Sequence, residues 1–593
     1  MKTASALAVC VWLFAFDCLE AAEDLAAALV EQAGTDFLGS LRVENPKLLL
    51  EKLDGISAKF GDRLSDDLPL IAQRFLKNPL LAGVEMRRPW TFLFLNPRHH
   101  TNNLAIVVGV SNADVFRDSF GKGGVSNVKA DPATSGAAIR RFSETEDAYD
   151  HRGYVAALRT GKKVEPFQFR RPVTRQYHVT VRGGEGVIVG DVALVDKLPV
   201  GVTPVGSDRL RGDVALAVHL PNVLALYEKE IRQRKAEALE AARDSSARLV
   251  RMLGAHFDVV LNLARQVAWV EAAAEFRDGG LKLKLAVPPL ADSAFSRAFA
   301  GQQPRSGDAA LLALMPPDAA MLGALRFTKT PEWTAFLLEL MRPVIEASAA
   351  NNAVGVAPLQ SAYRAALETC GDAVAVAVMT PSANAGSADV VEAVRVTDAA
   401  RARQAHRKTA EAGLPLCGGG LQPGIAGKPK YEAAVAQHAG VEMDRITAEF
   451  GAPASGSAGT NLVWHVAFTD HLEFIASGPA ATNNLQRLIS AAKSLSPTSG
   501  KTRNKAATAA WSRKHNGVFC LDLGEYFGLL RDAAFLAADD AHMRRLQTLL
   551  TEAGADITGH VLFQPRGPLF EMEVPIDKLV EVFSKKVAEP AAP

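Results

Sequence analysis

The chain has 593 residues and a formal net charge of +1, with 48% hydrophobic and 22% charged residues. A chain of this length exceeds one ordinary hydrophobic core, so two to four domains are expected. The near-zero net charge excludes a global attraction to nucleic acid or to an anionic membrane surface, and the composition is that of an ordinary globular protein.

The first 22 residues have the pattern of a signal peptide. Lys2 is the only early positive charge, an apolar run follows from Ala4 to Phe16, and small residues close the segment at Ala21. The run is too short to span a bilayer, and no later stretch reaches the roughly 18 uninterrupted apolar residues of a membrane helix. We therefore expect export, with the mature chain in the bacterial periplasm or secreted.

The cysteines do not form a disulfide framework. Cys18 offers lipid attachment as an alternative to simple cleavage, although Asp17 stands where a small residue would be wanted. Removal of the leader leaves Cys370, Cys417 and Cys520, which are too few to staple a chain this long. Three buried thiols are expected, and one bridge from Cys370 to Cys417 is the alternative.

Strands and helices alternate through the first 200 residues. Asn45 and Pro46 have the usual chemistry of a helix start, and Asn112 caps a short helix that follows a hairpin. Gly121 to Glu146 is rich in glycine, serine and charge and is expected to be a loop. The other expected elements are a strand 37–43, helices 47–53 and 68–76, a hairpin 91–95 and 104–110, a strand 154–158, a hairpin 177–181 and 187–189, and a helix 191–198.

A longer unit occupies residues 213–300. Its pattern predicts a strand 213–220, a helical tract 221–266, a hairpin 269–288 and a closing helix 291–300. The tract is apolar on one face at both ends and charged in its middle, at residues 232–243. A charged middle indicates a solvated projection, and a partner-binding arm is the alternative.

After a polar connector the same order of elements begins again. Five matching pairs of segments start at residues 38 and 322, 96 and 380, 110 and 396, 178 and 465, and 270 and 557, with offsets of 284, 284, 286, 287 and 287. Unrelated matches would scatter, so the pattern predicts an internal duplication. We expect an α+β fold of two similar halves, each a mainly antiparallel sheet covered by helices on one face. The expected domains are a signal peptide 1–22, a first half 23–305, a connector 306–318 and a second half 319–590.

Catalytic motifs are scarce. The chain has no Gly-x-Ser-x-Gly elbow, phosphate loop, His-Glu-x-x-His or Cys-x-x-Cys. Ser490 and Lys493 have the Ser-x-x-Lys spacing of penicillin-recognising enzymes, in which one helical turn joins hydroxyl and amine. The companion Ser-Asp-Asn and Lys-Thr-Gly elements are absent, so this match is not expected to be a site. Gly121 to Gly124 lacks the strand-then-helix setting of a phosphate loop and is expected to be a flexible loop.

Histidines and basic stretches are expected to be structural or solvated. His99 and His100 share a turn, but a metal site needs three or four ligands, and His151 and Asp150 join them only if loops fold together. The other residues weighed were His178 and His465 on equivalent strands, Arg170, Arg171 and Arg175 beside Phe167 and Phe169, and a basic stretch at 501–514, for which nucleic-acid binding or docking to an anionic surface is the alternative. No catalytic, cofactor-binding or metal-binding residue is predicted.

Hairpins run directly into helix starts at six junctions, at residues 110–111, 190–191, 288–289, 396–397, 477–478 and 575–576. This rhythm resembles exported bacterial proteins of unknown function built from repeated strand–helix–hairpin–helix modules, a resemblance that implies no activity and no functional residues. The sequence predicts a non-catalytic scaffold or binding protein of the bacterial envelope, without a cofactor, whose partner is an envelope protein or an apolar ligand. The alternatives are a carrier of lipid or another apolar ligand, and a hydrolase with a site assembled from distant loops.

Overall fold

The computed structural model describes most of the chain after the expected leader. The signal peptide expected at residues 1–22 and the strand expected at 154–158 lie outside the described residues. The described residues are 34–60, 64–100, 102–122, 128–134, 136–149, 170–198, 210–241, 247–304, 310–352, 355–380, 388–411, 429–449, 461–494, 515–532 and 541–587.

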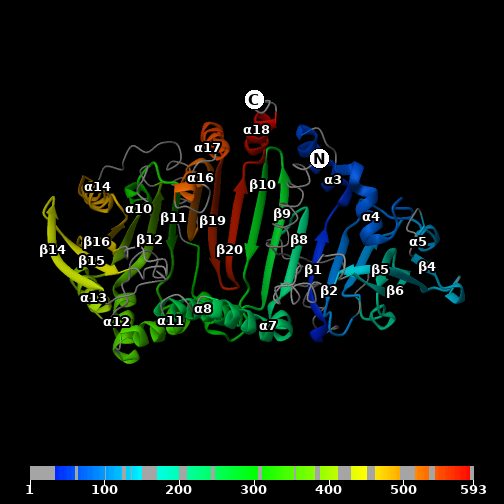
Figure 1. The fold of residues 1–593 in the computed structure, drawn as a ribbon, viewed down its shortest axis with the longest axis horizontal. Coiled ribbons are helices and arrows are strands. Elements are labelled where there is room, and N and C mark those ends of the chain that lie inside the picture. Colours follow the sequence, from blue (N-terminus) through cyan, green and yellow to red (C-terminus); the bar gives the residue numbers. More distant parts are fainter. Residues whose placement is uncertain are drawn as a thin grey trace. The chain divides into compact units, whose positions relative to one another are not determined.

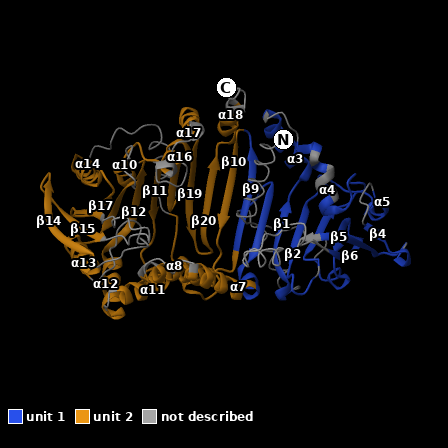
Figure 2. Cartoon of the chain, in the orientation of Figure 1, with its two compact units in different colours: residues 1–226, 270–278 blue, residues 227–269, 279–593 orange. Residues whose placement is uncertain are grey.

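Antiparallel strands dominate the structure (Figure 1). The chain forms two compact units, which Figure 2 shows in different colours. Unit 1 comprises residues 1–226 and 270–278, and unit 2 comprises residues 227–269 and 279–593. Strand β9 (Trp269–Arg277) thus lies in unit 1, apart from its first residue, and β10 (Gly280–Ala286) in unit 2.

Unit 1 is a sheet with short helices. Its hydrogen-bonded strand order is β8 (Val214–His219), β1 (Phe37–Val43), β2 (Trp90–Leu95), β3 (Leu104–Gly109), β7 (Glu185–Val189), β6 (Arg170–Arg182), β5 (Arg140–Tyr149) and β4 (Val128–Ala130). The helices are α3 (Pro46–Ser57), α4 (Leu68–Leu76) and α5 (Ala113–Ser119), with short 3-10 turns at 34–36, 58–60, 64–67, 132–134 and 192–194.

Local sequence signals, such as capping residues, were sufficient to predict most elements of unit 1. The Asn45 side chain accepts a hydrogen bond from the Leu48 N–H, and Asn112 accepts one from Val115, which confirms both predicted caps. The loop prediction for residues 121–146 is wrong, because β4 and most of β5 lie there. Strand β5 pairs with β6 along its whole length, so its partner strand determines its structure more than its polar composition does.

Unit 2 holds a longer sheet. Its strand order is β10, β20 (Gly567–Val574), β19 (Asp556–Gln564), β18 (Gly517–Asp522), β11 (Met321–Arg326), β12 (Cys370–Met379), β13 (Asp389–Val396), β17 (Leu472–Ser477), β16 (Asn461–Phe468), β15 (Val441–Glu449) and β14 (Lys430–His438). Its helices are α8 (Ala247–Ala264), α9 (Ala294–Ala300), α10 (Ala310–Leu314), α11 (Pro331–Asn352), α12 (Val356–Thr369), α13 (Ala399–Glu411), α14 (Ala481–Ser494), α16 (Leu523–Asp532), α17 (Ala541–Ala553) and α18 (Ile576–Val587).

The helical tract expected at 221–266 forms two helices, α7 (Leu220–Ala241) and α8. In unit 2 they are joined by ion pairs from Lys235 to Asp258 and from Arg265 to Glu228. Apolar residues of α8, such as Met252 and Val259, are buried in a cluster with residues of α11 and α12. The charged middle of the tract therefore lies on α7, where most side chains from 228 to 240 are exposed.

The expected fold class of two duplicated halves, each with its own sheet, is wrong. The described strands of each unit pair antiparallel, and no duplication of two halves is evident. Within unit 2, β10 comes from the expected first half, yet it pairs with β20, the last strand of the expected second half, from Leu281 opposite Val574 to Ala286 opposite Leu569. The backbone N–H and C=O groups at the edge of a strand can pair with any neighbouring strand, and the local sequence pattern does not specify which strand that is.

Helices also cover both faces of the unit 2 sheet, where one covered face was expected. Leu485 and Leu488 of α14 and Leu312 of α10 are buried in a cluster with Ala375 and Ala393, on one face. On the opposite face, His406 of α13 contacts Glu473 of β17. Side chains on a strand alternate between faces, and both faces of β13 and β17 are therefore buried here.

Candidate ligand-binding face

Three rows of uncharged side chains cross the unit 2 sheet on one face, which we call the apolar face. The strand registers place residues of every second position in line across β10, β20, β19, β18, β11, β12 and β13. The first row is Leu281, Val574, Ile557, Leu521, Met321, Val378 and Val390; the second is Leu283, Met572, Gly559, Phe519, Gly323 and Val376; the third is Leu285, Phe570, Val561, Gly517, Leu325, Val374 and Val394.

The rows are long enough for a lipid chain. Neighbouring strands lie about 4.8 Å apart, so the six spacings from β10 to β13 give a row of about 29 Å. The hydrocarbon core of a bilayer, which contains two layers of acyl chains, is about 30 Å thick. One row is therefore about as long as two acyl chains end to end.

The two faces of these strands differ in burial. On the apolar face Leu283, Phe519 and Val376 are partly exposed, and Met321 is 39% exposed. On the other face Ala375 and Val518 are buried in the cluster with α10 and α14. On β11 and β12 the side chains of the apolar face are therefore partly exposed although their neighbours one position along the strand are buried, whereas on β10, β20 and β19 side chains on both faces are partly exposed.

Gly323 has no side chain, so it leaves a gap in the second row between Phe519 and Val376, which we call the notch. Among the described residues, a Cβ atom built at Gly323 would have one neighbour within 4 Å, the Val518 carbonyl oxygen at 3.9 Å. A Cβ at Gly559 in the same row would lie 2.2 Å from Cζ of Phe519. The Phe519 ring thus covers Gly559, whereas no described side chain lies within 4 Å of a Cβ at Gly323.

Helices lie at both ends of these strands in unit 2. Figure 1 shows α8, α11 and α12 along one end and α16, α17 and α18 along the other. At the first end, aromatic rings form a cluster. The ring centroid of Phe299 of α9 lies 5.1 Å from that of Phe563 and 5.5 Å from that of Trp333. Edge-to-face contacts of this kind stabilise a dry aromatic cluster.

The rows end in carboxylates on β13 and β17, beneath helix α13. Glu392 lies opposite Val376 of the second row, and Glu473 lies opposite Val394 of the third. His406 Nε2 lies 2.6 Å from Oε1 of Glu473, with the two side chains 6% and 3% exposed. Burial opposes the charged form of His406, but the charges of Glu473, Glu392 and Asp444 outweigh it and raise the His406 pKa.

A second buried carboxylate, Asp444 on β15, holds the same helix. Arg403 Nε of α13 donates to Asp444 at 2.6 Å, and Arg403 also pairs with Glu442 at 2.6 Å. The Tyr431 hydroxyl and the Ala434 N–H donate to Asp444 as well. Asp444 is 1% exposed, so these donors replace the water that its charge has lost.

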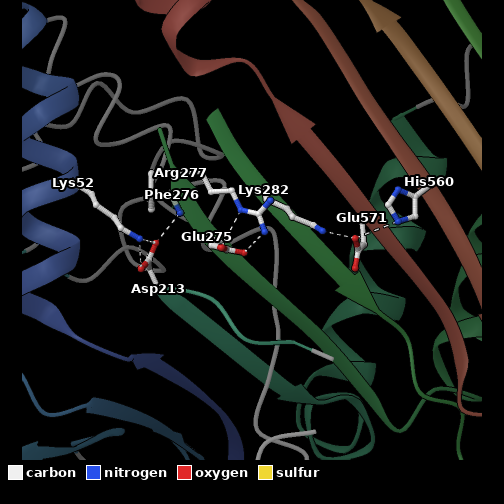
Figure 3. A network of polar contacts seen from close by, with 8 residues as sticks. All are labelled: Lys52, Asp213, Glu275, Phe276, Arg277, Lys282, His560 and Glu571. Carbon is white, nitrogen blue, oxygen red and sulfur yellow. Dashed lines mark hydrogen bonds and ion pairs between the residues drawn. The ribbon is translucent and has the colours of Figure 1, made fainter. Parts of the chain in front are cut away.

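On the polar face of β10, β20 and β19, Glu571 joins the three strands through its side-chain contacts. Figure 3 shows its carboxylate between Lys282, at 2.6 Å, and His560 Nε2, at 3.2 Å. The His515 ring stacks on His560 with centroids 3.9 Å apart. The hydrogen bond from His560, with the Lys282 contact, outweighs burial and lowers the Glu571 pKa to about 2. This network fastens the three strands that begin the apolar rows.

Unit 1 has polar networks of its own, which hold its elements together. Figure 3 also shows Asp213, which accepts hydrogen bonds from Lys52 of α3 at 2.7 Å and from the Phe276 N–H of β9 at 2.7 Å. Elsewhere in unit 1 the buried Glu144 accepts from Lys77 at 2.8 Å and from the Tyr177 hydroxyl at 2.7 Å. Each of these carboxylates joins two or more elements of unit 1, so its role is structural.

Of the histidines that the sequence singled out, the neighbours His99 and His100 both contact Asp36. His99 Nδ1 lies 2.5 Å from Asp36 Oδ1 and the buried His100 has its Nε2 3.6 Å from Oδ2, whereas His151 and Asp150 lie outside the described residues. Burial lowers the pKa of both His178 and His465. Among the described residues, no group of three or more His, Cys, Asp or Glu side chains could hold a metal ion.

Ser490 does not contact Lys493 as the Ser-x-x-Lys match requires. The Lys493 amine donates instead to the Ala439 carbonyl, while Ser490 Oγ lies 2.7 Å from His438 Nε2. His438 is 52 residues away in the sequence, so no local motif could have indicated this pair. Both contacts join the turn between β14 and β15 to the last turn of α14.

The remaining expected features are partly outside the described residues. Arg170, Arg171 and Arg175 lie on β6, whereas the neighbouring phenylalanines, Gly124 and the basic stretch 501–514 are not described. Cys370 and Cys520 are free thiols, and Cys417 is not described. Burial raises the pKa of Cys370 to about 12, which makes its thiol unreactive.

No protein-family model matches the chain, and neither the curated proteins nor the solved structures include a match. Of the helices within the described ranges, none is both long and apolar enough to cross a membrane. The inference about function therefore depends on the geometry of this chain alone.

Proposed function

We propose that the protein is a non-catalytic binding protein of the bacterial envelope that carries an apolar ligand of the acyl-lipid class on the apolar face. The observation that supports this most directly is the second row, in which Gly323 leaves a notch between Phe519 and Val376. A lipid chain laid across the strands would fill the notch and cover the rows on both sides.

Apolar side chains left in contact with water cost free energy, which a bound apolar ligand would recover. Burial of apolar surface contributes about 25 cal/mol per Å², or about 0.8 kcal/mol per buried methylene group. Soluble monomers rarely expose contiguous apolar patches above a few hundred Å², and such patches mark binding sites. From β10 to β12 the rows carry no charged side chain, so this part matches the hydrocarbon part of a ligand, whereas the second row meets Glu392 on β13.

Native mass spectrometry of the purified full chain tests the proposal. We expect a ligand-bound species that returns to the bare mass after extraction with organic solvent, and an extract that contains acyl lipids. A bare mass before extraction, together with no binding of a fluorescent C16 fatty acid, would overturn it. If a protein copurifies on the same face instead, the scaffold alternative is favoured.

One contact favours the hydrolase alternative. Ser490 Oγ lies within hydrogen-bond distance of His438, as a nucleophile and its base would. Within the described part of the chain, however, no carboxylate pairs with His438 to orient its ring. A serine-directed fluorophosphonate probe decides between the two functions: labelling that Ser490→Ala abolishes supports a hydrolase, and an unlabelled protein supports binding alone.

A further inference from the structure

Helices α7 and α8 carry a large share of the exposed apolar side chains. Twelve large apolar side chains are exposed in the part of the chain that the structure describes, and four of them lie on these two helices: Tyr227, Ile231, Phe257 and Val260. The two ion pairs between α7 and α8 hold the helices side by side. Single exposed apolar residues need no explanation, but several on one pair of helices indicate an interaction surface.

Helix α8 has an apolar stripe with the alternating three- and four-residue spacing of a heptad seam. We call it the α8 stripe; it consists of Val250, Leu253, Phe257, Val260 and Ala264. Phe257 is 47% and Val260 67% exposed, and the other three side chains are partly buried. A different face of α8, with Met252 and Val259, packs in the cluster with α11 and α12. The helix is thus apolar on two faces, and the second face is largely in contact with solvent.

The charges of the segment that carries the α8 stripe are mainly positive. Residues 247–265 contain three arginines, at positions 248, 251 and 265, and one acidic residue, Asp258. Asp258 pairs with Lys235 of α7 at 2.7 Å, so its charge does not offset the arginines. An apolar stripe accompanied by basic side chains is typical of a helix that lies on an anionic lipid surface, and this local excess exists although the whole chain is nearly neutral.

A second copy of the chain matches this surface less well. If two α8 stripes packed antiparallel about Phe257, Arg251 of one copy would come opposite Arg265 of the other, and if they packed parallel each arginine would come opposite itself. Like charges opposite each other across an interface oppose association. The same arginines attract the phosphate groups of an anionic bilayer, so the charges favour a lipid surface over a second copy.

The C-terminal end of α8 lies beside the apolar face. Two residues after Ala264, the Gln266 carbonyl oxygen accepts a hydrogen bond from the Leu290 N–H at 2.7 Å. Leu290 is 40% exposed and follows Leu285, where the third row begins, by five residues. Figure 1 shows α8 along this end of the unit 2 strands. A surface that receives α8 is therefore close to the third row.

We propose that the α8 stripe docks the protein on an anionic lipid bilayer. The helix lies in the plane of the surface, with Phe257 and Val260 among the upper parts of the acyl chains and the arginines at the level of the phosphate groups. The docking does not depend on the proposed function. The transfer of a lipid chain between the bilayer and the third row rests on it.

Flotation of the full chain with lipid vesicles tests the docking. One set of vesicles contains phosphatidylcholine alone, and the other contains equal parts of phosphatidylcholine and phosphatidylglycerol. We expect the partition coefficient to be at least about tenfold higher for the anionic vesicles and to fall as salt is added, because salt screens the attraction between arginine and phosphate.

Val260→Glu places a charge in the α8 stripe and should lower the partition coefficient on anionic vesicles at least about tenfold. Val115→Glu is the matched control, because Val115 is also an exposed valine on a helix, α5 of unit 1, and the substitution changes the net charge equally. It should bind like the wild type. Val260→Thr keeps the shape of the side chain and covers the case in which Val260→Glu does not fold; it should lower the coefficient at least about threefold.

Absence of wild-type binding to the anionic vesicles would overturn the proposal, as would equal binding by the wild type and both Val260 variants. If native mass spectrometry shows a dimer that Val260→Glu dissociates, a second copy covers the α8 stripe and the proposal is wrong. Gly323→Leu, which fills the notch on the apolar face, should bind vesicles like the wild type. Failure of the proposed ligand site would therefore leave the vesicle result unchanged.

Discussion

The Phe519 ring lies over Gly559, its neighbour across the β18–β19 pair, and fills the space that a side chain at Gly559 would need. Gly323, the neighbour of Phe519 on the other side, is covered by no side chain in the described part of the chain. The two glycines occupy the same row, but a Cβ at Gly559 would meet the Phe519 ring and the Glu571 carbonyl oxygen, both at 2.5 Å or less. That asymmetry produces the notch on which the proposed binding depends.

Gly559→Ala should therefore destabilise the protein. The new methyl group would lie 2.2 Å from Phe519 Cζ and 2.5 Å from the Glu571 carbonyl oxygen, and the backbone oxygen has little freedom to move. Overpacking of this kind costs about 1–3 kcal/mol. Urea unfolding measures the difference.

Gly323→Ala is the matched control on the same row. Of the described atoms its methyl group would meet only the Val518 carbonyl oxygen, at 3.9 Å, and alanine reduces the entropy of the unfolded chain. We expect a free energy of unfolding within about 0.5 kcal/mol of the wild type, or slightly higher. Equal losses at both glycines would mean that the space above Gly323 is filled.

Asp444→Asn should be strongly destabilising. The substitution removes the buried charge that Arg403, Tyr431 and the Ala434 N–H share, and it leaves Arg403 with the exposed Glu442 as partner. Loss of one member of a buried ion pair costs about 3–5 kcal/mol. Thermal and urea unfolding of the same variant should both show the loss.

Glu442→Gln provides the comparison for Asp444, because it contacts the same arginine. The Glu442 side chain is 52% exposed, and an exposed ion pair contributes about 0–1 kcal/mol. A loss at Glu442 as large as that at Asp444 would contradict the conclusion that the buried carboxylate holds α13.

Glu571 should make the stability of unit 2 depend on acid. Its pKa is lowered to about 2, by the His560 hydrogen bond first and then by Lys282. A lowered pKa contributes stability that is present above the unfolded pKa of about 4.3 and is lost as the pH falls toward 2. Glu571→Gln should lower the free energy of unfolding by about 1–3 kcal/mol at pH 6, with the difference shrinking between pH 5 and pH 2. A difference that is constant with pH would show that the charge of Glu571 is not involved.

Local chemistry made individual elements predictable. The strand expected at 37–43 is β1, and the capping side chains of Asn45 and Asn112 act where the sequence indicated. These signals act over three or four residues, so a single sequence contains them completely. The β14–β15 hairpin was not predicted, because β14 is mostly exposed and lacks an alternating apolar pattern, and because its turn begins at Ala439, which has an unusual positive φ of 50°.

The partners of strands were not predictable in the same way. Leu281 and Val574 lie opposite each other although 293 residues separate them, and nothing in either segment specifies the other. The apolar face could not be found from the sequence for this reason, since each strand contributes only two or three residues to it. His406 and Glu473 likewise meet only because α13 folds over β17.

Binding of a fluorescent C16 fatty acid by wild type, Gly323→Leu and Gly280→Leu tests the central claim most directly. Both substitutions add the same side chain to a strand of unit 2, but Gly280 lies with Lys282 on the polar face, where its Cβ would have an ordinary contact of 3.4 Å. We predict that Gly323→Leu weakens binding at least about tenfold, a loss of about 1.4 kcal/mol, while Gly280→Leu binds like the wild type. Equal affinities for all three proteins, or no binding by any of them, would contradict the account.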